Sequence, residues 1–208
     1  MTQKRDFDKG AAQWDQLPRR VALAQAVVAA IKQEVALNPD MRLLDYGAGT
    51  GLVTMGLQPL VKEVIAVDSS RGMLEQLENK AREAGITNLQ TILINLEQDW
   101  QLPRGLDLLV SSMTMHHVPL VAPLLAHFRE SMRSGAQLCI ADLDREDGSF
   151  HDDPTGVHHQ GFSREEMEGY FRQAGFTDVR TVLVMTVHKE RDGRVDDYPV
   201  NLTLGTAP

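Results

Sequence analysis

Hydrophobic and polar positions change period along the chain, alternating between the spacing of helices and that of strands. Over residues 19–37 apolar residues recur every three or four positions, which predicts an amphipathic helix that ends at Asn38-Pro39. Two apolar segments near the carboxyl end flank a polar stretch, 189–197, and predict an antiparallel hairpin with a long turn. The predicted strands are 42–46, 63–68, 89–94, 106–111 and 136–144, then 178–187 and 199–206 for the hairpin.

Start and stop signals delimit two of the intervening helices. Ser69 or Ser70 can cap a helix that Gly85 ends. Ser163 and Glu166 form a capping-box pattern for a later helix. The buried stripe predicted for the first of these helices consists of Met73, Leu77, Ala81 and Ala84.

Strands that alternate with helices indicate an α/β fold with a doubly wound, mostly parallel sheet, here of seven strands and with a C-terminal antiparallel hairpin. Ligands in such sheets bind at the carboxyl ends of the strands. We expect residues 1–208 to form one domain, with residues 1–38 as an N-terminal helical lid and 39–208 as the core.

A glycine-rich turn follows the first predicted strand, where the sequence runs DYGAGTG over residues 45–51. Its glycines permit a tight turn and close approach of the backbone to a ligand. Asp68 ends the next strand, where an acidic side chain accepts hydrogen bonds from ribose hydroxyls. A dinucleotide-binding turn would have glycine in place of Leu52, which disfavours an NAD(P)-dependent oxidoreductase.

The composition and net charge of the chain disfavour several kinds of partner. The 208 residues are 42% hydrophobic and carry a formal net charge of −8 without a basic block, which disfavours nucleic acid as a partner. No apolar run is long enough for a membrane span, and we expect a cytoplasmic protein. The single cysteine, Cys139, excludes a disulfide framework and a cysteine-based zinc site within this chain.

LLDYGAGTG followed by VIAVDSSRGML resembles the first two motifs of class I S-adenosylmethionine-dependent methyltransferases, in particular the small bacterial type, and the likeness extends over about residues 40–206. It implies a Rossmann-like fold and S-adenosyl-L-methionine as cofactor. In this family Asp45 and the glycine-rich turn face the methionine end of the cofactor, and Asp68 holds the ribose. The implied cofactor-binding residues are Asp45, Gly47, Ala48, Gly49, Thr50, Gly51, Asp68, Ser69, Met73, Asn95, Leu96, Glu97, Ser111 and Ser112.

One position departs from the family pattern. Asn95 stands where the family often has an aspartate that accepts a hydrogen bond from the adenine amino group. The asparagine carbonyl can accept the same bond. Glu97 and Asp99 are alternative acceptors.

Candidate chemistry for the methyl acceptor lies after the fourth strand and in a later loop. His116 and His117 are candidate general bases near the methyl group, and the alternative is that histidine stands there without a catalytic role. The loop at 145–162 contributes His158 and His159 as substrate-contact candidates, together with Trp14 from the N-terminal lid. No metal site is expected, since no helical His-x-x-x-His pair or cysteine partner accompanies these histidines.

The sequence therefore predicts methyl transfer from S-adenosylmethionine to a small-molecule acceptor by direct in-line displacement. The alternatives are a non-catalytic module that binds S-adenosylmethionine or S-adenosylhomocysteine, and an NAD(P)-dependent oxidoreductase. Neither the acceptor nor the oligomeric state follows from the sequence.

Overall fold

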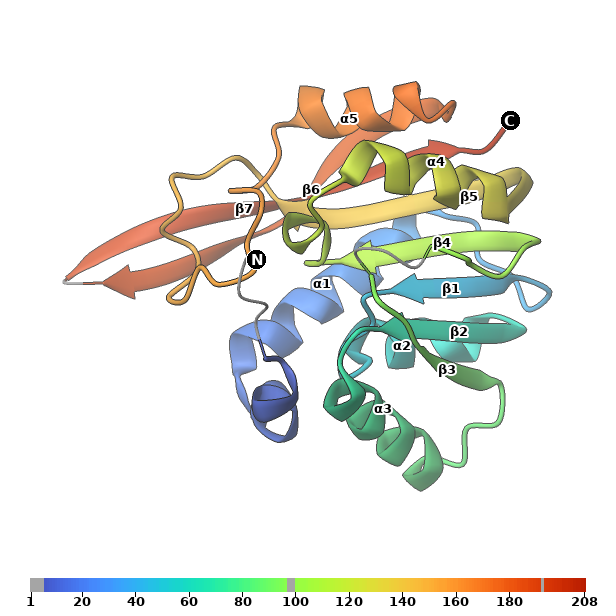
Figure 1. Ribbon diagram of the computed structural model, residues 1–208, viewed down its shortest axis with the longest axis horizontal. Coiled ribbons are helices and arrows are strands. Elements are labelled where there is room, and N and C mark those ends of the chain that lie inside the picture. The colour runs from blue at the N-terminus through green and yellow to red at the C-terminus, as the bar shows by residue number, and fades with distance from the viewer. Residues whose placement is uncertain (1–5, 97–99, 192) are drawn as a thin grey trace.

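The computed structural model describes residues 6–96, 100–191 and 193–208. These residues form one seven-stranded sheet (Figure 1). Its strands are β1 (Arg42–Tyr46), β2 (Glu63–Asp68), β3 (Leu89–Leu93), β4 (Leu106–Ser112), β5 (Met132–Leu143), β6 (Thr177–Arg191) and β7 (Arg194–Thr206). The order across the sheet is β3-β2-β1-β4-β5-β7-β6, with β1 to β5 parallel and β7 antiparallel to both of its neighbours. The predicted fold class is confirmed.

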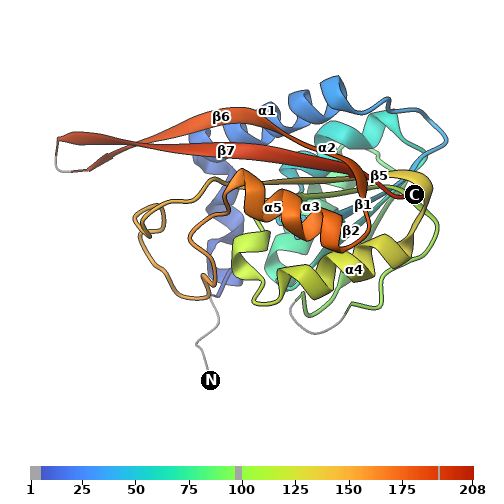
Figure 2. The same ribbon diagram turned by 90° about the horizontal axis from the view of Figure 1, so that it is seen from above.

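Helices cover both faces of this sheet (Figure 2). They are η1 (Asp8–Gln16), α1 (Pro18–Glu34), α2 (Leu52–Leu57), η2 (Gln58–Leu60), α3 (Arg71–Glu83), η3 (Met115–His117), α4 (Val121–Ser131) and α5 (Arg164–Gln173), where η marks a 3-10 helix. Apolar residues of α1 and α2 pack on one face in one buried cluster, and those of α4 and α5 pack on the other face in a second. Within the described segments, no helix is long and apolar enough to cross a bilayer.

Strand β1 lies between two helical layers, and its side chains pack against both of them. Leu43 belongs to the α1 and α2 cluster, whereas Leu44 and Tyr46 belong to the α4 and α5 cluster. Successive side chains of a strand point to opposite faces, so both faces of this central strand are apolar. This is why two apolar residues, Leu43 and Leu44, stand side by side in the sequence of the strand.

Both predicted helix caps form. The Ser70 hydroxyl accepts a hydrogen bond from Met73 N at the start of α3, and the Ser163 hydroxyl accepts one from Glu166 N at the start of α5. The stripe predicted for α3 is wrong at Ala84, which is exposed and lies just past the last helical residue. Leu74 is buried in its place, because the apolar face of α3 is wider than a single line of side chains.

The long turn predicted between the last two strands is wrong. The β6–β7 ladder continues through the polar stretch, where His188 pairs with Asp197 and Lys189 with Asp196. Figures 1 and 2 show this end of the hairpin projecting past the rest of the sheet. A ribbon without a helical layer over it carries polar side chains, so its sequence has the composition of a turn.

Truncation of Leu125 tests the packing of α4 on the sheet. Leu125→Ala removes a fully buried side chain, and we expect the free energy of unfolding to fall by about 2–5 kcal/mol in urea denaturation. Leu183→Ala is the matched control because its side chain is 54% exposed, and it should change stability by less than about 0.5 kcal/mol. Equal losses from the two variants would contradict the packing described here.

Candidate functional site

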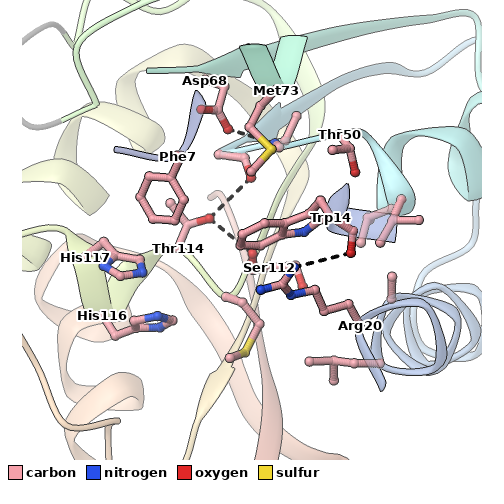
Figure 3. Close-up of a pocket in the computed structure, with 18 of the residues that line it drawn as sticks. Phe7, Trp14, Arg20, Thr50, Asp68, Met73, Ser112, Thr114, His116 and His117 are labelled. Atoms are coloured by element: carbon pink, nitrogen blue, oxygen red, sulfur yellow. Dashed lines mark hydrogen bonds between the residues drawn. The ribbon is translucent and has the colours of Figure 1, made fainter. Parts of the chain in front are cut away.

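A cavity of about 350 Å³ opens at the carboxyl ends of β1, β2 and β4 (Figure 3). The loops after these strands form its floor, and Phe7, Trp14 of η1 and the first two turns of α1 form one wall. Residues of the loop at 145–162, with Val187 and Lys189 of β6, contribute another wall. Segments that are far apart in the sequence thus meet at the edge where ligands bind in parallel sheets.

The glycine-rich turn after β1 is held by the end of β2. Gly47 N and Ala48 N donate hydrogen bonds to Val67 O at 2.9 and 3.0 Å, and Gly49 N donates to Asp68 Oδ2 at 2.7 Å. Gly47 has a φ of +76°, and a Cβ there would lie 2.2 Å from the Thr114 hydroxyl oxygen. A Cβ on Gly49, by contrast, would meet no heavy atom within 4 Å. The turn is therefore tight on one side and open to a ligand on the other.

Two buried carboxyl groups stand beside this turn. Asp45 Oδ2 accepts a hydrogen bond from the Thr54 hydroxyl at 2.5 Å, and burial raises the pKa of Asp45 to about 7. Asp68 accepts bonds from Gly49 N and from Ser70 N, at 2.7 and 2.8 Å, yet burial still raises the pKa of Asp68. Because both side chains line the cavity, a cation or a hydroxyl donor from a ligand would stabilise the ionised forms.

The acidic residues of the 3-10 helix η1 bond it to the loops after β1 and β2 and to α3. Asp8 accepts hydrogen bonds from the Ser70 hydroxyl and from Gly72 N. Asp15 accepts one from the Thr50 hydroxyl at 2.6 Å and forms an ion pair with Lys80 at 2.7 Å. Within the expected lid, it is η1 that lies over these loops, whereas α1 packs on the sheet as part of the core.

Trp14 and Arg20 meet on the same wall of the cavity. The Arg20 guanidinium carbon lies 3.5 Å from the centre of the Trp14 ring, and the Arg20 side chain donates to the Trp14 carbonyl oxygen at 3.3 Å. Both residues line the cavity, as Figure 3 shows. The stacking fixes a cation in the wall of the cavity.

The two candidate histidines differ in their surroundings. His116 is 1% exposed, and its Nδ1 lies 2.6 Å from Oδ1 of Asp142, a buried residue near the end of β5. His117 Nδ1 lies 2.7 Å from the Gly156 carbonyl oxygen, and burial together with the neighbouring His116 lowers the pKa of His117 to about 3. His117 is consequently neutral at physiological pH, with its proton on Nδ1.

The acidic partner of His116 carries a charge in the protein interior. Burial alone would raise the pKa of Asp142, but attraction to His116 and hydrogen bonds from His116 and Leu143 N hold it below the ordinary value. Asp142 is therefore an ionised carboxylate within hydrogen-bonding distance of an imidazole.

The loop at 145–162 turns a mixed aromatic and polar surface toward the cavity. Phe150 contacts the His151 ring edge-on at 4.9 Å, and His151 lies 4.8 Å from the His116 ring. Lys189 of β6 donates to the Phe150 carbonyl oxygen at 2.6 Å and to Asp152 at 3.0 Å. These bonds attach the loop to the part of the hairpin that projects past the sheet (Figure 1).

Most of the residues expected at the site line the cavity, and several do not. The lining includes Trp14, Asp45, Gly47, Ala48, Gly49, Thr50, Asp68, Ser69, Met73, Leu96, Ser112, His116 and His117. Gly51, Asn95, Ser111, His158 and His159 lie elsewhere, and Glu97 and Asp99 fall outside the described residues.

The residues away from the cavity have other contacts or positions. Ser111 donates its hydroxyl proton to the Tyr46 carbonyl oxygen, and His159 places Nε2 3.0 Å from the Val118 carbonyl oxygen. His158 and Asn95 are exposed. A Cβ on Gly51, at a φ of +80°, would lie 2.2 Å from a Leu77 methyl carbon, so this glycine serves the packing of α3.

Sequence reasoning missed several residues in or behind the lining of this cavity. Arg20 and Lys189 belong to an ordinary helix and strand, and Asp142 ends an apolar run without any motif. The one available signal was charge on segments that also carry a buried apolar pattern. Among the described residues, no group of three or more histidine, cysteine, aspartate and glutamate side chains is arranged to hold a metal ion.

A seven-stranded sheet with this order and a cavity over its glycine-rich turn are the architecture of S-adenosylmethionine-dependent methyltransferases. A family model described as a methyltransferase domain matches residues 16–181. The chain belongs to this methyltransferase-domain family, and S-adenosylmethionine is the cofactor of the class. The predicted family and cofactor are thereby confirmed.

Curated relatives agree with this assignment. The chain is 25% identical to an uncharacterized methyltransferase, C1347.09, of Schizosaccharomyces pombe, over 68% of this chain and 55% of that protein. It is 24% identical to ribosomal RNA small subunit methyltransferase A of Desulfitobacterium hafniense, over 66% of this chain and 48% of that protein. The chain spans about half the length of these curated relatives.

Solved structures share the fold. The YcgJ protein of Bacillus subtilis superposes with a TM-score of 0.71 at 15% identity, covering 86% of this chain and 97% of that one. Phosphoethanolamine N-methyltransferase 2 of Haemonchus contortus, in complex with S-adenosyl-L-methionine, superposes with a TM-score of 0.70 at 12% identity, covering 98% and 60%. Identities this low establish the architecture alone.

The raised pKa of Asp45 predicts a pH dependence of stability. Its carboxyl group keeps its proton in the folded, ligand-free protein up to about pH 7 but loses it near pH 4 when unfolded, so this group's stabilisation is complete below pH 4 and is lost as pH rises toward 7. We expect Asp45→Asn to remove up to about 4 kcal/mol of that dependence in urea unfolding. If the free energy of unfolding of the variant changed between pH 4 and pH 7 by as much as that of the wild type, the assignment would be contradicted.

Proposed function

We propose that this protein transfers the methyl group of S-adenosylmethionine to a small-molecule acceptor by direct in-line displacement inside the cavity. The observation that carries the proposal is the position of the glycine-rich turn, with Gly49 open to the cavity and Asp68 buried beside it. The family assignment supports methyl transfer rather than hydride transfer from a dinucleotide.

The cavity residues fit the chemical groups of the cofactor. We assign Asp68 to the ribose hydroxyls, because a buried carboxylate at the end of β2 accepts hydrogen bonds from both. Leu96 and Met73 are buried apolar residues of the lining and suit the faces of an adenine ring. Ser69 lies beside them in the cavity wall. Asn95 stays a prediction as acceptor for the adenine amino group.

The amino-acid end of the cofactor would lie near opposite charges. Its ammonium group suits the Asp45 carboxylate, since a cation there would lower the pKa that burial raises. Its carboxylate suits the Arg20 guanidinium, which Trp14 holds against the cavity. Thr50 donates its hydroxyl proton to Asp15 of η1, so the loop below this end is braced by the lid.

When bound, S-adenosylmethionine supplies an electrophilic methyl group on a positively charged sulfur. The protein's part is to align an acceptor with that group at about 3–3.5 Å and to exclude water. Phe7, Phe150 and Val118 provide apolar surface for the acceptor, next to the rings of His116 and His117. The two histidines are the candidates for removal of a proton from the acceptor.

The acceptor we propose is small because the cavity is enclosed by η1 and by the loop at 145–162. A volume of about 350 Å³ is at the lower end of the range of small-molecule sites. Nucleic acid is disfavoured by the net charge of −8. The ribosomal RNA methyltransferase among the relatives is the reason to include RNA in the acceptor screen.

The proposal is tested by incubating the protein with S-adenosylmethionine labelled in the methyl group and a panel of phenols, alcohols, amines, carboxylates, thiols and ribosomal RNA. We expect label in a small-molecule product. Label in RNA would contradict the proposed acceptor class. Cofactor binding without any labelled product would favour a non-catalytic binding module.

Removal of Asp68 should weaken cofactor binding. Each hydrogen bond to a charged group contributes about 1.5–3 kcal/mol, so Asp68→Ala should raise the Kd for S-adenosylhomocysteine at least about 10-fold by calorimetry. Asp107→Ala is the matched control, because Asp107 also accepts a backbone bond, from Arg42 N, but lies outside the cavity lining. A Kd that is the same in Asp68→Ala and in the control would refute the ribose assignment.

Removal of the Arg20 side chain should weaken binding of the amino-acid half of S-adenosylhomocysteine and leave binding of the adenosine half unchanged. Arg20→Ala should raise the Kd for S-adenosylhomocysteine about 10-fold or more, because a charge-assisted bond to its carboxylate is lost. The same variant should bind 5′-methylthioadenosine as the wild type does, since that fragment lacks the amino-acid group. Equal loss of affinity for both ligands would place Arg20 in a general packing role instead.

A further inference from the structure

We infer that Asp142 and His116 form an acid–base pair in which Asp142 positions His116 to take a proton from the acceptor, so that the acceptor is a hydroxyl or N–H compound. The inference rests on the proposed function and deepens it. Asp142 is absent from the cavity lining and acts through His116, which makes it a positioning residue. Of the two candidate histidines, His116 is the one that Asp142 contacts through a ring nitrogen, and Asp142 belongs to no sequence motif.

Three contacts fix the geometry of the pair. Oδ1 of Asp142 lies 2.6 Å from His116 Nδ1 and also accepts a hydrogen bond from Leu143 N at 2.8 Å. Oδ2 accepts one from His116 N at 3.3 Å. Both oxygens therefore act as acceptors, which suits an ionised carboxylate. The proton of the imidazole must then be on Nδ1.

This arrangement leaves the other ring nitrogen for the ligand. With Nδ1 protonated and directed at Asp142, Nε2 of His116 carries the lone pair, and the ring lines the cavity (Figure 3). His117 Nδ1 instead meets the carbonyl oxygen of Gly156, which is uncharged. Of the two rings, His116 is the one whose protonated form has a carboxylate to stabilise it.

The backbone of His116 holds the ring in place. Its carbonyl oxygen accepts hydrogen bonds from His158 N and His159 N, at 2.9 and 3.1 Å. His116 is thereby bonded to the end of β5 on one side and to the loop at 145–162 on the other. Movement of Asp142 or of that loop would displace the base from the cavity.

The proton balance identifies the class of acceptor. As the acceptor oxygen or nitrogen bonds to the methyl carbon, the carbon–sulfur bond breaks with its electron pair left on sulfur, and the acceptor proton moves to His116 Nε2. The positive charge passes from sulfur to the imidazolium beside Asp142. A carboxylate or a thioether carries no proton to remove and would gain nothing from the pair.

The tautomer of His116 tests the inference without turnover. We expect nuclear magnetic resonance of the full chain, labelled with nitrogen-15 in histidine and saturated with S-adenosylhomocysteine, to show that the neutral form of the His116 ring has its proton on Nδ1 and not on Nε2. A neutral form with its proton on Nε2 would overturn the inference. The wild-type spectrum decides this even where a variant fails to fold.

Turnover of Asp142→Asn supplies the second readout. An amide can accept on one side only, so the Nδ1–H tautomer should lose its preference, and kcat for a phenol, alcohol or amine from the panel should fall about 100-fold or more. The KM of S-adenosylmethionine should change less than threefold. Asp197→Asn is the matched control, because its exposed pair with His188 has the same 2.6 Å contact far along the hairpin.

The outcomes separate the pair from the proposed function. Wild-type kcat in Asp142→Asn, or product from carboxylates alone, would overturn the acid–base pair and leave methyl transfer standing. No product from any acceptor would overturn both, and the binding of S-adenosylhomocysteine would then remain as a property of the fold.

Discussion

The site depends on the parallel pairing of β1 with β2. The register places Tyr46 beside Val67, so the turn that follows β1 begins level with the end of β2. From there Val67 O accepts two hydrogen bonds from the turn, and Asp68 accepts a third. A slip of one residue would exchange the faces of every side chain and break all three bonds. The position of the glycine-rich turn is thus a consequence of sheet register.

Two carboxyl groups of this cavity are buried without enough hydrogen bonds to replace the water they lose, which is uncommon in a protein interior. Asp45 and Asp68 are buried with hydrogen bonds that do not offset their loss of water, since burial raises the pKa of both. On the acceptor side, Asp142 is compensated by His116. The ligand-free protein therefore has two acidic groups, Asp45 and Asp68, whose ionised forms a bound cation would stabilise, whereas Asp142 already has His116 as its partner.

Much of the fold followed from the sequence because its elements carry strong local signals. The strand 42–46 and the strand 63–68 were predicted with the bounds that β1 and β2 have, since both are short apolar runs between turn residues. The hairpin of β6 and β7 was predicted, but its outer part was taken for a long turn because an exposed ribbon has the composition of a loop.

The site was predictable where the residues follow a motif and hidden where they meet only in three dimensions. Asp45, Gly47 and Asp68 lie at strand ends and line the cavity. Asp142 and Lys189 come from strands whose relation to the cavity depends on sheet order and hairpin length. His158 and His159 were the predicted substrate contacts of the loop at 145–162, yet it is His151 of that loop that lines the cavity, which sequence spacing does not encode.

The most direct test of the central claim is a calorimetric titration of the wild-type protein with S-adenosylhomocysteine and, separately, with NAD. The account predicts saturable binding of S-adenosylhomocysteine at one site per chain and no binding of NAD. Binding of NAD alone, or of neither ligand, would contradict it.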